Sequence, residues 1–433
     1  MPLERGDQLP EVPVPPPGSR SRELSADLAR FEAPGVNTLG GPGGDEPAVV
    51  WAEALGANVL DADGNRYVDL TSGFGAAAVG HRHPRVVAAV REQAGRLLHG
   101  LGDVAAHPAR IELARRLADL VPVDDPRIYL AVSGADAVEV AAKTAILATG
   151  RPDLVAFEPA YHGLSLGALA LTSRPEFRRP FARHLHPGVH RLPYGAEPWA
   201  VERLTRRHPV AAVVLEPVVG REGIVPPPAG WLAGVAEVCR RRGVLLVADE
   251  VFTGFGRTGR LFAVEEEGVR PDLLCCGKAL GGGLPIGAVA GRAPLMAAWR
   301  TGGEALHTGT FLGHPLAAAA ALAVLDLMAE EGLPERARSL GAEVARRTAS
   351  WPDRFEAVTA VRGRGLMHGV ELAHRAAAKR AAAGLLARGF LALAGGPEGR
   401  VLQLLPPLTV TGGQLAAALG AAEEVLALDS RTP

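Results

Sequence analysis

The chain has 433 residues, with 46 Lys plus Arg, 47 Asp plus Glu and a formal net charge of −1. The near-neutral balance argues against a nucleic-acid-binding surface as the main function, and the length allows two or three domains. The three cysteines give no disulfide framework and no CxxC metal pair, which fits a reducing compartment. Without a long apolar run or a secretion signal, we expect a soluble, cytoplasmic protein with no membrane partner.

The first part of the chain predicts short elements. Residues 1–20 are proline-rich and predict an extended or disordered arm. An amphipathic pattern over 21–33 predicts a short helix, and the glycine-rich segment 40–47 predicts a loop. Residues 49–73 alternate in the manner of a β-meander, and Pro84 stands at the first turn of a further helix.

The middle of the chain, from His107 to Thr301, alternates strand and helix patterns. This alternation predicts a mainly parallel sheet covered by helices on both faces. The expected strands are Ile128–Val132, Leu154–Phe157, Ala211–Leu215, Val244–Ala248, Leu273–Cys276 and Ala288–Ala290. After Pro315 the composition changes to long Ala/Leu/Arg helices, a strand pair at 354–362 and 365–372, and a last helix.

One lysine stands out chemically. Only three lysines occur among the basic residues, and Lys143 and Lys379 lie in helical patterns that indicate solvated faces. Lys278 follows a buried-strand pattern and precedes three glycines, which leave room for a flat ring. Arginine cannot lose its proton near neutral pH, so Lys278 is the candidate for an amine that forms a Schiff base. Asp249 ends the preceding strand pattern, and we expect the two side chains to meet at one sheet edge.

The motifs DEVFTGFGRTG at 249–259 and CGKALGGGLPIGAV at 276–289 resemble those of the class III aminotransferases. These enzymes of fold type I use pyridoxal phosphate and include 4-aminobutyrate, acetylornithine and omega-aminotransferases. The resemblance runs from about residue 45 to about residue 425 and implies an α/β fold, with a large, mainly parallel mixed sheet domain and a smaller α+β domain from both chain ends. The expected parts are an arm at 1–20, a first piece of the small domain at 21–74, a cofactor domain at 75–320 and the C-terminal small domain at 321–433.

The resemblance gives the strand-end residues specific roles. Lys278 would hold the cofactor aldehyde and later carry a proton between the substrate carbon and the cofactor, while Asp249 would keep the ring nitrogen protonated. Ser133, Gly134 and Ala135 lie between a strand and a helix, where free backbone N–H groups can bind the phosphate.

Three further residues take their roles from the resemblance alone. Tyr161 would stack on the cofactor face. Glu216 would lie near the cofactor and pair with a substrate-binding arginine or, without one, receive a cationic or hydroxylated substrate. Thr310 would reach the phosphate of the neighbouring subunit, which implies a homodimer with shared active sites. His162, next to Tyr161, receives no role.

Two other patterns carry less weight. The run GFGRTG at 254–259 spells a dinucleotide motif, but no helical pattern follows it. His81 and His83 lie in a turn with no acid or thiol close in sequence, so we expect no metal site.

The substrate side departs from the family. Many members bind the substrate carboxylate with an arginine in a segment like VLRFxPPL; here the segment is VLQLLPPL, with Gln403 at that place, and Ile146 stands where the bacterial 4-aminobutyrate enzymes have another arginine. Glutamine cannot make the charged two-pronged contact of a guanidinium group. Either another arginine supplies the charge, or the substrate lacks a carboxylate near its amine, as in a diamine, an amino sugar or nucleoside aldehyde, or a larger biosynthetic intermediate; we favour the second. The candidate arginines are Arg400, Arg221 and Arg260.

We therefore expect a pyridoxal-phosphate-dependent aminotransferase with a biosynthetic role. A donor amine or amino acid would load the cofactor, and an aldehyde or ketone acceptor would then take the amino group by a ping-pong mechanism. The alternative is an aminomutase of the same fold, like the glutamate-1-semialdehyde enzymes, which needs no separate acceptor. Decarboxylases and racemases of this fold share the lysine and the aspartate, and a non-catalytic scaffold is a further alternative.

Overall fold

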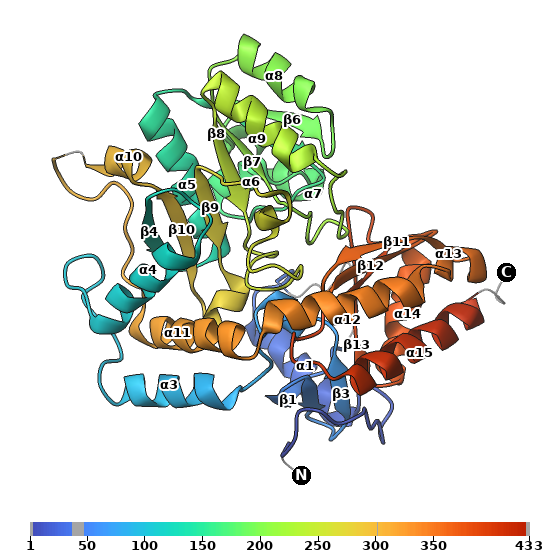
Figure 1. The fold of residues 1–433 in the computed structure, drawn as a ribbon. Helices are drawn as coiled ribbons and strands as arrows, with labels where there is room; N and C mark the ends of the chain where they lie inside the picture. Colours follow the sequence, from blue (N-terminus) through green and yellow to red (C-terminus); the bar gives the residue numbers. More distant parts are fainter. Residues whose placement is uncertain (1–2, 37–46, 301, 430–433) are drawn as a thin grey trace.

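The computed structural model describes residues 3–36, 47–300 and 302–429. It consists of a large part built on a seven-stranded sheet and a smaller part built on two four-stranded sheets (Figure 1). The loop predicted at 40–47 lies almost wholly outside the described residues. None of the helices in these ranges is long and apolar enough to cross a membrane.

The large sheet has the strand order β4-β10-β9-β8-β7-β5-β6. Its strands are β4 (Pro126–Ala131), β5 (Asp153–Glu158), β6 (Val189–Pro193), β7 (Val210–Leu215), β8 (Leu245–Asp249), β9 (Leu273–Cys276) and β10 (Gly287–Arg292). The neighbours from β9 to β6 are parallel, and β10 is antiparallel to both β9 and β4. The six predicted strands are confirmed. The prediction missed β6, an edge strand whose sequence VHRLP lacks a buried apolar run.

Helices cover both faces of this sheet, as the alternation of patterns predicted. The helices of this part of the chain are α2 (Ser72–Gly75), α3 (Pro84–Ala94), α4 (Pro108–Leu120), α5 (Gly134–Thr149), α6 (Leu166–Leu171), α7 (Pro175–Arg178), α8 (Pro198–Arg207), α9 (Trp231–Arg242), α10 (Ala293–Met296) and α11 (Pro315–Glu330), and not all of them contact the sheet directly. In β7 all six residues are buried. Ala212 and Val214 pack in one core cluster with α5 and α6, while Val213 and Leu215 pack in the other with α4 and α9. A strand buried on both faces needs such a continuous apolar sequence.

Both ends of the chain build the first small sheet. The predicted β-meander is present as β1 (Trp51–Leu55), β2 (Asn58–Asp61) and β3 (Arg66–Asp69), and β13 (Phe390–Leu391) pairs in parallel with β3. The segment before α1 (Ser19–Phe31) runs alongside this sheet, because the backbones of Glu11 and Arg66 exchange hydrogen bonds of 2.8 Å.

The second small sheet is antiparallel, in the order β11-β12-β15-β14. Its elements are α12 (Leu333–Thr348), α13 (Trp351–Arg354), β11 (Val358–Arg364), β12 (Met367–Leu372), α14 (Arg375–Ala387), β14 (Leu393–Gly395), β15 (Val401–Leu404) and α15 (Gly412–Asp429). The strand predicted from Arg354 starts only at Val358, since a helical turn with a proline in its first positions precedes it. The architecture confirms the predicted fold class. The boundaries at residues 20, 74 and 320 stay predictions, and α11 runs across the last.

Candidate active site

The parallel neighbours β8 and β9 bring the acid and the lysine to the same sheet edge. Strand β8 ends at buried Asp249, which pairs in register with Cys275 of β9, and Lys278 follows two residues after β9 ends. The Nζ atom of Lys278 lies 4.3 Å from the centroid of the Phe252 ring. The backbone of Lys278 has a φ of 40°, in the left-handed region that non-glycine residues rarely adopt and that recurs at functional sites.

Desolvation controls the protonation of Lys278. Burial lowers the pKa of its amine to about 8, although the nearby charges of Asp249 and Glu216 act in the opposite direction. A lysine with a pKa near 8 has an appreciable neutral fraction near neutral pH, and only the neutral amine attacks a carbonyl carbon.

Asp249 is held by a histidine to which the sequence reasoning gave no role. The Nδ1 atom of His162 lies 2.7 Å from Oδ2 of Asp249, and both side chains are buried. The other carboxylate oxygen accepts a hydrogen bond of 3.1 Å from the backbone N–H of Val251. Burial alone would lower the pKa of His162, but its hydrogen bond to Asp249 and that group's charge outweigh burial and raise the pKa. The hydrogen bond fixes the position of the Asp249 carboxyl group at the end of β8.

Glu216 anchors the backbone of two loops. One of its carboxylate oxygens accepts from the N–H of Tyr161 at 2.9 Å, and the other accepts from the N–H of Gly220 at 2.8 Å. Burial raises the pKa of this carboxyl group to about 7. With one backbone N–H on each oxygen, Glu216 ties together the two loops that carry Tyr161 and Arg221.

Arg221 is the candidate arginine that lies beside the aromatic residue of the site. Its guanidinium carbon lies 4.5 Å from the Tyr161 ring centroid and 5.3 Å from that of Phe177. The backbone oxygen of Arg221 accepts a hydrogen bond of 3.0 Å from the side-chain amide of Gln403, which is 8% exposed. Within the described ranges, no carboxylate forms an ion pair with Arg221. The fold therefore gathers Tyr161, Arg221 and Gln403 in one place.

The other two candidate arginines are bound elsewhere. Arg400 forms ion pairs with Glu371 at 2.7 Å and with Glu398 at 3.2 Å. Arg260 pairs with Glu266 at 3.0 Å, on the surface. Each guanidinium group already has an acidic partner, so Arg221 is the arginine available to a substrate carboxylate.

The N-terminus of α5 offers unpaired donors. The Ser133 hydroxyl caps the helix by accepting from the N–H of Asp136 at 3.1 Å. The N–H groups of Gly134 and Ala135 have no acceptor among the described residues, and such groups at a helix start bind anions. A side chain at Gly134 would not fit, since a Cβ atom there would lie 2.6 Å from Cγ1 of Val251. These features fit a phosphate group.

Thr310 lies apart from this constellation. It is exposed, and no hydrogen bond or ring contact joins it to the other predicted site residues in the described part of the chain. Its neighbour Phe311 is 59% exposed and lies with its ring centroid 5.3 Å from that of His99. Thr310 therefore faces outward from a surface formed by the segments before α4 and before α11.

The glycine-rich run at 254–259 joins the two parts of the molecule. Arg257 is buried and donates to the backbone oxygens of Leu366 at 3.0 Å and Pro406 at 2.6 Å, and to the Ser72 hydroxyl at 3.2 Å. Burial lowers the pKa of this guanidinium group to about 10. Its role is to hold three distant segments together around the site, and the geometry gives no nucleotide-binding turn.

Known proteins are similar to this chain along nearly its whole length. The family model "Aminotransferase class-III" matches residues 40–426. The acetylornithine aminotransferase of Methanopyrus kandleri is 42% identical over 371 residues, covering 86% of this chain and 92% of the relative. The putrescine aminotransferase of Pectobacterium atrosepticum is 38% identical over 398 residues, covering 89% of this chain and 83% of the relative.

A solved structure agrees with these relatives. An amine transaminase from an uncultivated Pseudomonas species, determined with pyridoxal phosphate bound, superposes with a TM-score of 0.83 at 30% identity. The match covers 91% of this chain and 98% of that one. By sequence and by fold, the chain belongs to the class III aminotransferase family and is a transaminase.

Proposed function

We propose that this transaminase uses pyridoxal phosphate and acts on a substrate that carries a carboxylate. The phosphate would bind at the N–H groups of Gly134 and Ala135, the ring nitrogen would face Asp249, and the aldehyde would face Lys278. When bound, pyridoxal phosphate accepts the electron pair left on the substrate carbon as its C–H bond breaks.

Lys278 and Asp249 would have separate roles in the reaction. Lys278 would accept the proton of the substrate carbon and later donate it again, which its pKa of about 8 permits near neutral pH. Asp249, held by His162, would face the ring nitrogen and favour its protonated form. The same groups act in reverse when a carbonyl acceptor takes the amino group, so one site serves both half-reactions.

Support for a carboxylate substrate comes from Arg221. Its guanidinium group lies against Tyr161 without an acidic partner, and Gln403 supports its backbone. Glu216 already holds two backbone N–H groups, so we assign the substrate contact to Arg221 rather than to Glu216. This geometry reverses our preference for a carboxylate-free substrate, and it fits the acetylornithine aminotransferases among the relatives. A biosynthetic amino acid is the substrate class proposed.

The test compares two donors in the first half-reaction. We expect Arg221→Gln to slow conversion of the bound cofactor by N-acetylornithine about 100-fold, the size expected for a charged two-pronged contact. Conversion by a carboxylate-free amine such as putrescine should change less than threefold. The measurement is the single-turnover change in visible absorbance without acceptor.

Two controls separate a binding role from a general one. Arg260→Gln removes an arginine that pairs with surface Glu266, and we expect wild-type rates with both donors. Arg221→Lys keeps the charge but not the fork geometry and should recover part of the amino acid rate. If Arg221→Gln slows both donors equally, Arg221 does not select for the carboxylate; if cofactor fails to bind the wild-type chain, the whole assignment fails.

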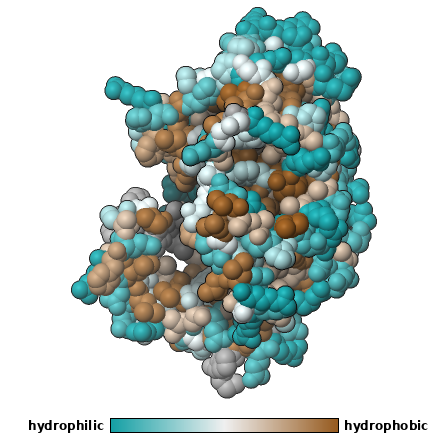
Figure 2. All heavy atoms as spheres, turned by 90° about the vertical axis from the view of Figure 1, so that its left-hand side faces the viewer, coloured by the Kyte–Doolittle hydropathy of each residue, from teal (hydrophilic) through white to brown (hydrophobic). Residues whose placement is uncertain are grey.

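We also propose that the chain forms a homodimer through the face that carries Thr310. Figure 2 shows this side of the molecule, on which hydrophobic side chains gather in groups. Exposed large apolar residues of the segments before α4 and α11, and of α4 itself, are Leu97, Leu98, Leu101, Val104, Ile111, Leu306 and Phe311. Apolar patches of this kind mark protein–protein interfaces.

A further inference from the structure

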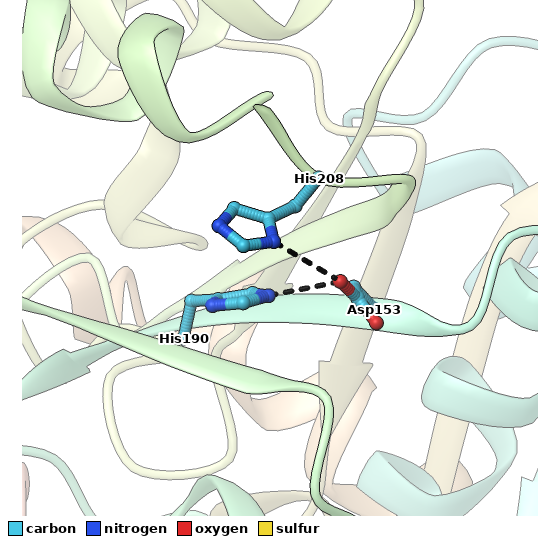
Figure 3. A group of neighbouring side chains, drawn as sticks. All are labelled: Asp153, His190 and His208. Carbon is cyan, nitrogen blue, oxygen red and sulfur yellow. Dashed lines mark hydrogen bonds and ion pairs between the residues drawn. The ribbon is translucent and has the colours of Figure 1, made fainter. Parts of the chain in front are cut away.

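A second group of reactive side chains lies at the opposite ends of the strands that carry the active site. Figure 3 shows how these side chains lie toward one another. Asp153 is the first residue of β5, His190 is the second residue of β6, and His208 lies in the turn between α8 and β7. One ligand atom from each of these residues lies within 4.8 Å of the others. Since β5 has six residues, about 20 Å of strand separates this group from the loop that carries Tyr161.

Both imidazoles face the same carboxylate oxygen. Nε2 of His190 lies 2.9 Å from Oδ2 of Asp153, a normal hydrogen bond, whereas Nδ1 of His208 lies 3.8 Å from it, too far for one. The two rings are 4.0 Å apart between centroids and tilted by 38°. As Figure 3 shows, Nδ1 of His208 is directed at an oxygen that already has a donor.

The surroundings leave the group accessible on one side. The side chains of Asp153, His190 and His208 are 15%, 24% and 39% exposed. Gly188 lies directly against the carboxylate, because a Cβ atom there would be 2.6 Å from Oδ1 of Asp153. Nε2 of the nearby His186 forms a hydrogen bond of 2.7 Å with the backbone oxygen of Pro152. An ion from solvent can therefore reach the two rings and the carboxylate.

Two imidazole nitrogens and one carboxylate oxygen are ligands that zinc-class ions prefer. Around a tetrahedral ion with bonds of about 2.1 Å, ligand atoms lie about 3.4 Å apart. The distances of 2.9 and 3.8 Å bracket that value, so small movements of the half-exposed His208 and of the carboxylate suffice. Coordination through Nε2 of His190 requires its proton to move to Nδ1, which a neutral imidazole allows.

We propose that Asp153, His190 and His208 form a binding site for one divalent transition-metal ion of the zinc class, with water in the fourth position. The ion joins the edge strand β6 to β5 and to the turn before β7. It acts on stability rather than on transamination, because the active-site residues lie at the other ends of these strands.

The experiment uses the cofactor-loaded protein after treatment with a chelator and removal of the chelator. With zinc at about 100 times its dissociation constant, we expect the melting temperature to rise by about 3 °C for a chain of this size. Cobalt(II) should bind one ion per chain and give the intense visible bands of a tetrahedral site. Transaminase activity should be the same with and without metal.

Three variants identify the ligands. His208→Gln lies in a half-exposed turn and alters no strand pairing, so we expect a folded, active protein without the cobalt bands or the zinc-dependent rise. His190→Gln should behave alike, whereas His184→Gln, at an exposed histidine of the neighbouring segment, should keep both signals. If His208→Gln keeps the full response, the ion binds elsewhere, and if the wild-type chain shows neither signal, the site does not exist.

Discussion

At the scale of single residues, the site depends on a buried histidine and a buried acid that hold each other. Asp249 has only the N–H of Val251 and the ring of His162 as partners among the described residues, and the second contact is the shorter, at 2.7 Å. A hydrogen bond to a charged group contributes about 2 kcal/mol, more than a neutral one. His162 is therefore a positioning residue that acts through Asp249.

Replacing this histidine tests that role. We expect His162→Phe to lower kcat about 30-fold with little change in KM. The reason is that the variant loses the hydrogen bond that orients Asp249, which contributes about 2 kcal/mol. His162→Asn, whose amide can still donate, should recover part of the rate. The pH midpoint at which the bound cofactor changes its visible spectrum should also move in His162→Phe, because the charge beside the ring is no longer fixed.

A matched variant checks the specificity of this effect. His374→Gln changes an exposed histidine in the small part of the molecule, and we expect wild-type kinetics and an unmoved spectral midpoint. A lower kcat in His162→Phe without a spectral shift would indicate a general packing defect and contradict the role through Asp249.

At the scale of elements, the start of α5 is where backbone alone supplies the binding groups. The helix begins at a glycine because Val251 occupies the space that a side chain would need. The amide groups at that helix start thus remain open to an anion.

A single methyl group tests this arrangement. Gly134→Ala places a Cβ atom 2.6 Å from Val251, so we expect the side chain or the helix start to shift and the affinity for pyridoxal phosphate to fall about tenfold or more. The matched variant is Gly412→Ala, at the first position of α15, where no atom lies within 4 Å of the added Cβ. Equilibrium titration of the cofactor-free proteins with pyridoxal phosphate measures the affinity of each variant. If Gly134→Ala binds the cofactor as tightly as Gly412→Ala does, the result would contradict a phosphate site at α5.

At the scale of the whole molecule, Thr310 is exposed, and the proposed homodimer would cover it with a second subunit. The surface around it is apolar, and the ring contact between His99 and Phe311 joins residues 212 positions apart in the sequence. A homodimer built on this face would bring Thr310 of one chain to the phosphate of the other.

Mixed dimers test that arrangement. Lys278→Ala removes the amine and Thr310→Ala weakens cofactor binding, so each variant alone should be nearly inactive at limiting cofactor. If Thr310 acts across the interface, mixed dimers contain one intact site, and we expect about a quarter of wild-type activity after random reassociation. Thr308→Ala is the control and should behave as wild type. No recovery on mixing would show that Thr310 does not complement the other subunit.

Much of this protein follows from local sequence. The apolar strand runs, the β-meander and the helix that begins at Pro84 came out as predicted, because their signals lie within a few residues. The positions of Lys278, Asp249 and the start of α5 at strand ends also follow from local pattern, while their roles stay predictions. The edge strand β6 was missed because half-buried strands carry weak patterns.

Tertiary structure alone decided the rest. Which of the three candidate arginines lies beside Tyr161 depends on packing between distant segments, and the fold places Arg221 there. The same holds for the contact of His162 with Asp249, 87 residues away in the chain, and for the meeting of Asp153, His190 and His208. The sequence determined the elements and the chemistry at their ends, because these are local properties; the fold determined the partners, because partners come from pairing and packing between distant segments.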